Sequence, residues 1–135
     1  MPPIPGTFTF DLVIFASRKM VDNPLIEAFL WVVIFDMATG LLKSFFPKAK
    51  KKADSTTGIQ GAIKHILIMV LILTIYPMLD VLGFDTIANS AVVFYISTYA
   101  VSILENLDVM GVPFPTFVKN KFEKMAKDND KEEKQ

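Results

Sequence analysis

Asp36 and Lys43 are charged residues inside an apolar segment, residues 25–46, that is long enough to cross a bilayer. With Thr39 and Gly40 they recur at i, i+3, i+4 and i+7, which places all four on one face of a helix. A carboxylate at the bilayer centre costs roughly 2.5–3.5 kcal/mol, whereas each Leu, Ile, Phe or Val contributes only about 0.3–0.6 kcal/mol to insertion. The segment therefore inserts on its apolar bulk if Asp36 faces protein or water. Such a side chain serves to organise helices or to let water and ions pass.

Two further apolar segments, residues 63–82 and 87–106, each carry a similar polar stripe. In the second of them the stripe is Tyr95, Thr98, Ser102 and Glu105, at i, i+3, i+7 and i+10. In lipid, helices associate through close packing and interhelical hydrogen bonds, so three striped spans suit the assembly of several copies. The stripes equally suit a second role, which is to hold together the three helices of one chain. The candidate assembly or pore-lining residues are Asp36, Thr39, Gly40, Lys43, Tyr76, Asp80, Tyr95, Thr98, Ser102, Glu105 and Asn106.

The polar partner of Asp36 is expected outside its own helix. Lys43 is two helical turns away, roughly 10 Å, and is expected to extend to the headgroups instead. The candidate partners are the hydroxyls of Tyr95, Thr98 and Ser102, or Thr39 of a second copy. His65 is interpreted as an interfacial residue at the start of a helix rather than as part of a proton relay.

Catalysis is the function that the composition favours least. The chain has one histidine and no cysteine, and no nucleophile–base pair or metal cluster is evident. We therefore predict no catalytic, cofactor-binding or metal-binding residue. The net charge is zero, which gives no basic field for nucleic acid.

The chain is too short for two globular domains, and its 52% hydrophobic residues are clustered. This pattern predicts an all-α membrane protein with three transmembrane helices, an N-terminal interfacial segment and a short amphipathic C-terminal helix. Asn23 and Pro24 are typical of a helix N-cap and first turn. The last ten residues, rich in alternating charge, are expected to be disordered. The predicted segments are an interfacial arm (1–23), spans at 24–46, 63–82 and 87–106, a basic loop (47–62), and an amphipathic segment with a charged tail (107–135). After its lysines, the loop is either irregular or a short surface helix that starts at Ser55.

Lysine distribution predicts the orientation in the membrane. Residues 48–52 contain four lysines, and residues 116–135 contain six, whereas the link at residues 83–86 has no basic residue. Because basic residues near span ends stay in the cytoplasm, we expect the N-terminus outside and the C-terminus in the cytoplasm.

Five motifs follow one another along the chain. The first span contains Asp36-x-x-Thr39-Gly40-x-x-Lys43, the loop contains Ser55-x-x-Gly58-x-x-Gly61-x-x-Lys64, and the second span carries the acid Asp80 near its end. The other two are Ser102-Ile103-Leu104-Glu105-Asn106 and Gly111-x-Pro113-x-Pro115. In this order and spacing the five motifs resemble the phage-lysis and toxin-secretion holin family over roughly residues 28–120.

This resemblance implies a phage- or prophage-encoded protein of the bacterial cytoplasmic membrane. It would form homo-oligomers in the lipid bilayer and open lesions that release an endolysin, which is a cell-wall hydrolase, or a toxin. Two alternatives stay open: a small ion or proton channel with Asp36, Asp80 and Glu105 along its path, and a non-pore, antiholin-like regulator. Passage of a folded protein would distinguish the three.

Overall fold

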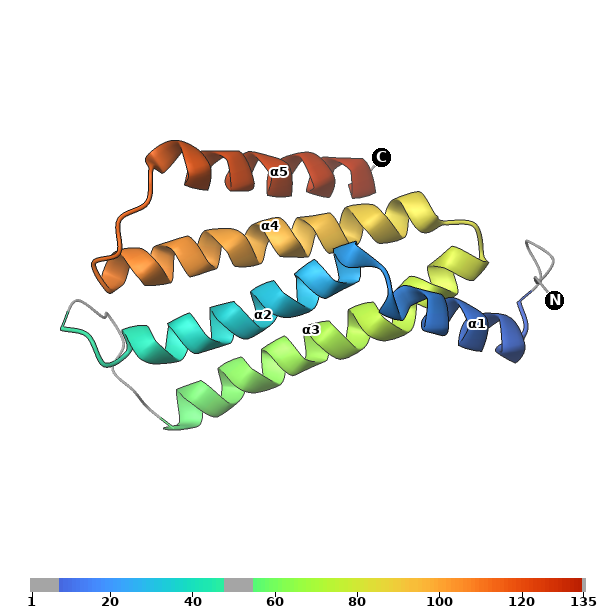
Figure 1. The fold of residues 1–135 in the computed structure, drawn as a ribbon, viewed down its shortest axis with the longest axis horizontal. Helices are drawn as coiled ribbons and strands as arrows, with labels where there is room; N and C mark the ends of the chain where they lie inside the picture. The colour runs from blue at the N-terminus through green and yellow to red at the C-terminus, as the bar shows by residue number, and fades with distance from the viewer. Residues whose placement is uncertain (1–7, 48–54, 135) are drawn as a thin grey trace.

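The computed structural model describes residues 8–47 and 55–134, and these residues form helices and the links between them. The helices are α1 (Phe10–Val21), α2 (Pro24–Lys43), α3 (Ser55–Val81), α4 (Asp85–Val109) and α5 (Thr116–Lys134). α2 to α5 lie alongside one another, and α1 packs against α3 (Figure 1). The predicted all-α fold is confirmed.

Three of the described helices are long and apolar enough to cross a membrane: α2, residues 58–81 of α3, and α4. The 20 residues of α2 span about 30 Å, which is the thickness of the hydrocarbon core. Large apolar side chains cover the outer surface of α2 and α3, including Trp31, Phe35 and Leu67, each more than half exposed. An apolar outer surface of this kind is suited to lipid.

Local sequence signals place several helix ends. The Asn23 side chain accepts a hydrogen bond from the Leu25 backbone N–H at 3.0 Å, and Pro24 is the first helical residue, so this predicted cap is confirmed. α2 ends at Lys43, before the predicted end of the span at residue 46. At the ends of α3 and α4, Gly83 and Gly111 have φ of 85° and 83°, a left-handed conformation that favours glycine.

α3 begins at Ser55, so the motif Ser55-x-x-Gly58-x-x-Gly61-x-x-Lys64 forms its first three turns. α3 therefore begins eight residues before the predicted span, inside the predicted loop, and ends at Val81, one residue before the predicted end. The basic run at residues 48–52 lies outside the described residues.

The expectation of a disordered tail is wrong, because α5 continues to Lys134. Nine of its 19 residues are the good helix formers Lys and Glu, and opposite charges recur at i, i+3 and i+4, as in Lys124 and Asp128. α5 also has a packing partner, because it lies along α4.

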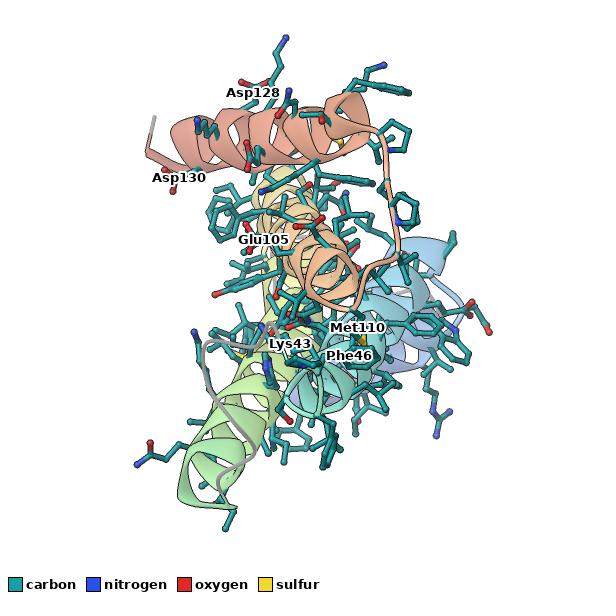
Figure 2. All side chains as sticks on the ribbon, turned by 90° about the vertical axis from the view of Figure 1, so that its left-hand side faces the viewer. Lys43, Phe46, Glu105, Met110, Asp128 and Asp130 are labelled. Carbon is teal, nitrogen blue, oxygen red and sulfur yellow. The ribbon has the colours of Figure 1, made fainter. Side chains whose placement is uncertain are left out.

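α4 is the central helix of the bundle. On one face, Val92 and Tyr99 pack with Phe29 and Val33 of α2 and Ile72 of α3. On the opposite face lies α5, so that α4 is enclosed between α2 and α5 (Figure 2).

Candidate functional site

A buried polar cluster joins α2 to α4. Asp36 of α2 is 6% exposed and Asn106 of α4 is 2% exposed. The Asn106 side-chain amide donates hydrogen bonds to Asp36 Oδ1 at 3.2 Å and to Thr39 Oγ1 at 3.0 Å. One amide therefore contacts two residues of the predicted polar face of α2. Gly40 lies beside the same amide, since a Cβ at this position would be 3.7 Å from Asn106 Nδ2.

His65 brings α3 into the cluster. Its Nδ1 lies 2.8 Å from the Tyr99 hydroxyl of α4, and its Nε2 lies 3.8 Å from Asp36 Oδ2. If Tyr99 donates its proton to Nδ1, the Nε2–H of a neutral imidazole faces the carboxylate. The cluster thus links all three candidate spans through one acid, one imidazole, one phenol and one amide.

The cluster explains how an acid is tolerated at this depth. Among the described residues, every buried side-chain nitrogen or oxygen atom has a hydrogen-bond partner. The donor to Asp36 within the chain is Asn106, so the prediction of a hydroxyl of Tyr95, Thr98 or Ser102 in this role is wrong. The alternative partner, Thr39 of a second copy, stays a prediction. Since buried polar groups are costly when unpaired, the network favours one arrangement of the three helices.

An open hollow of about 320 Å³ reaches the cluster from the surface. Its walls include Asp36, Lys64, His65, Tyr95, Thr98 and Ser102. The three predicted stripe residues of α4 therefore surround Asp36 without bonding to it. The hollow is large enough to admit water to a carboxylate that is otherwise enclosed by protein.

A second polar contact lies toward the other end of the bundle. The Tyr76 hydroxyl of α3 accepts a hydrogen bond from Asn23 Nδ2 at 2.8 Å and donates one to Asn89 Oδ1 at 2.6 Å. It joins the start of α2, the end of α3 and the start of α4. Tyr76 is one of the predicted site residues, whereas Asn23 is predicted only as a helix cap and Asn89 is not predicted at all.

The remaining predicted residues lie apart from the cluster. Glu105 is exposed and pairs with Lys119 of α5 at 3.2 Å. Lys43 lies in the last turn of α2, and Asp80 lies near the end of α3. Cβ atoms added at Gly58 and Gly61 would meet nothing within 4 Å, so these glycines are not required by packing within the chain.

Two members of the cluster, His65 and Tyr99, are absent from the predicted site. The sequence does hold a pattern that could have indicated Tyr99. The residues Tyr95, Tyr99, Ser102 and Asn106 recur at i, i+4, i+7 and i+11, which is also one helical face. The predicted face, with Thr98 and Glu105, differs from it by one residue at two positions. Helical spacing alone allows both.

The fold and the site define a class of protein: a helical membrane protein whose three candidate spans are joined by buried polar side chains. A family model for the bacteriophage holin family matches residues 20–127. The chain therefore belongs to the bacteriophage holin family.

Similar proteins occur in a phage and in bacteria. A probable holin of Bacillus phage phi105 is 27% identical over 87% of this chain and 82% of its own length. An uncharacterized protein of Clostridium perfringens is 31% identical over 80% of this chain and 78% of its own. An uncharacterized protein of Listeria innocua is 32% identical over 82% and 78%, respectively. No solved structure matches the chain significantly.

Proposed function

We propose that this protein acts as a holin: copies of it assemble in the bacterial cytoplasmic membrane and open lesions through which an endolysin, or a toxin, leaves the cell. Family membership and the probable holin of phage phi105 support this role. The observation that carries it is the cluster of Asp36, His65, Tyr99 and Asn106, which places polar groups inside a bundle whose outer surface is suited to lipid.

The cluster supplies what assembly needs, because its hydrogen bonds are exchangeable. Within one chain, Asn106 satisfies Asp36 and Thr39. When copies gather, the same groups can bond across neighbouring chains or to water, at little net change in hydrogen bonding. The hollow beside Asp36 gives such a neighbour or water a way in.

A small ion channel is less well supported by the geometry. Its path would join Asp36, Asp80 and Glu105, but these three acids lie apart. Glu105 is paired with Lys119 on the exposed side of α4, whereas Asp36 is buried between α2 and α4. An antiholin-like regulator would use the same contacts without opening a lesion, so only a release measurement separates it from a holin.

The function is tested by expressing the chain in bacteria with and without a cytoplasmic cell-wall hydrolase, while a cytoplasmic reporter enzyme is assayed in the medium. We expect abrupt lysis only when the hydrolase is present. Without the hydrolase, we expect the reporter to leave the cytoplasm but to stay inside the cell wall, and to reach the medium once the wall is opened. Loss of ions with retention of protein would instead identify a channel. Retention of both would identify a non-pore protein.

The orientation is tested by single cysteines, since the chain has none of its own. Phe84 precedes α4 and is exposed, whereas Val112 follows α4 and is also exposed. We expect Phe84→Cys to react with a membrane-impermeant thiol reagent in intact cells before release begins, and Val112→Cys to react only after lysis. The matched positions flank the same helix, so labelling of both in intact cells would contradict the proposed spanning of α4.

A further inference from the structure

α4 has a second buried face, and among the described helices only α5 is placed to cover it. Ser97 is fully buried, yet it lies about 200° around the helix from Tyr99, which faces α2 and α3. α5 packs along α4 on the opposite side from α2, and Glu105 pairs with Lys119 there (Figure 2). It follows that α5 buries Ser97.

This contact lies at the middle of a candidate span. Ser97 is the central residue of α4, with 12 residues of the helix on either side. α5 runs back along α4 from the Glu105–Lys119 pair (Figure 1). Since both helices rise about 1.5 Å per residue, the α5 residue opposite Ser97 is about residue 127, close to the half-buried Ala126.

α5 cannot lie in hydrocarbon at that depth. It contains six lysines and five acids, so eleven of its 19 residues are charged. The insertion penalty of each charge far exceeds the contribution of one apolar side chain. The side turned away from α4 is fully solvated, with Lys121, Lys124 and Asp128 exposed. α5 and the centre of a membrane-spanning α4 can be in contact only where water reaches the bilayer midplane.

The two sides of the molecule differ accordingly. On α2 and α3 the exposed side chains are mostly large and apolar, including Trp31, Phe35 and Leu67. On α5 they are mostly charged or polar, with Phe117 and Met125 as the apolar exceptions. The inner side of α5 holds Val118, Phe122 and Ala126 at steps of four, all half-buried. One copy thus presents a lipid-facing side and a water-facing side, with α4 between them (Figure 2).

We propose that α5 lines the aqueous side of the open lesion, folded back along α4 at the level of Ser97; this inference rests on the proposed holin function. In the intact membrane α5 is absent from that face and lies at the cytoplasmic surface. The link at residues 110–115, which turns at Gly111 and contains two prolines, permits both positions.

The experiment measures α4–α5 proximity in cells before and after release begins. Ser97→Cys and Ala126→Cys are introduced together into the chain, which has no cysteine of its own, and the cells are treated with an oxidant. A disulfide within one copy removes both thiols, so the monomer band then no longer reacts with a polyethylene-glycol maleimide. The matched control combines Ser97→Cys with Lys124→Cys, about 200° around α5 from Ala126. We expect at least a fivefold rise in the first disulfide when release begins, and no rise in the control.

Release without that rise would overturn the inference while leaving the holin function intact, and an equal disulfide yield before and after release would also overturn it. Failure of the unsubstituted chain to release any reporter enzyme would instead contradict the proposed function.

A second measurement does not depend on cysteine substitution at a buried site. Lysines 121, 124 and 127 are replaced together by leucine or together by glutamate. If α5 faces water in the lesion, the leucine variant should lose release and the glutamate variant should keep it, because glutamate is also hydrated. Equal release by both variants would count against the inference.

Discussion

Replacing Asp36 with leucine is expected to leave the amount of protein in the membrane unchanged and to abolish release of the cytoplasmic reporter. Leucine removes a carboxylate whose insertion costs roughly 2.5–3.5 kcal/mol, so insertion itself should not suffer. The substitution deletes the acceptor of Asn106 and the group that faces His65. A single interhelical hydrogen bond in a membrane contributes about 0.6 kcal/mol, and up to about 1.7 kcal/mol. That loss recurs in every copy of an assembly.

Asp36→Asn separates charge from hydrogen bonding. The asparagine keeps an oxygen that can accept from Asn106 but removes the negative charge near His65. We expect release to occur late, between the wild-type protein and the leucine variant. Ala38→Leu is the matched control, because Ala38 is an exposed residue of the same helix. Release on the wild-type schedule by both Asp36 variants would show that Asp36 is only tolerated.

The features that were predictable from sequence depend on local physics. The three candidate spans follow from hydropathy and length, and the start of α2 follows from the Asn23 cap and Pro24. These properties are set by residues close together in the chain. The same holds for the amphipathic character of α5, although its length is not obvious from a charged composition.

The predictions fail where a neighbouring helix determines which face of a helix is buried. Both faces of α4, the one with Thr98 and Glu105 and the one with Tyr99 and Asn106, satisfy helical spacing. Packing against α2 buries the second, because α4 is rotated so that Asn106 faces Asp36 and Thr39, whereas Glu105 faces α5. Helical spacing does not give this relative rotation of two helices.

His65 shows how one misplaced boundary changes the interpretation of a residue. With a span starting near residue 63, His65 lies in the first turn at the membrane interface. α3 in fact starts at Ser55, so His65 lies in the third turn, where α2 and α4 are both within reach. The glycines of the loop motif, poor helix formers, obscure this earlier start.

The second large effect is expected for Asn106→Asp, which places a second carboxylate in contact with Asp36. The present separation from Asn106 Nδ2 to Asp36 Oδ1 is 3.2 Å, and both residues are buried. Two negative charges about 4 Å apart repel by about 4 kcal/mol at an effective dielectric constant of about 20, until one carboxyl takes up a proton. This exceeds the hydrogen bond that the substitution removes. We expect loss of release and a lower thermal stability of the purified protein in detergent.

Exchanging the two side chains should reverse this loss. In the double variant Asp36→Asn with Asn106→Asp, one amide and one carboxylate face each other again, with the donor now on α2. Thr39 donates its hydroxyl proton to the Phe35 carbonyl in the present structure, and it can keep its contact with residue 106 by turning that proton to the new carboxylate instead. We expect release to recover to at least the level of Asp36→Asn alone. The double variant keeps one amide and one carboxylate, and it differs from the wild-type protein in the position of the negative charge relative to His65. If the double variant is as defective as Asn106→Asp, the contact between residues 36 and 106 does not govern release, and the cluster must act through His65 and Tyr99.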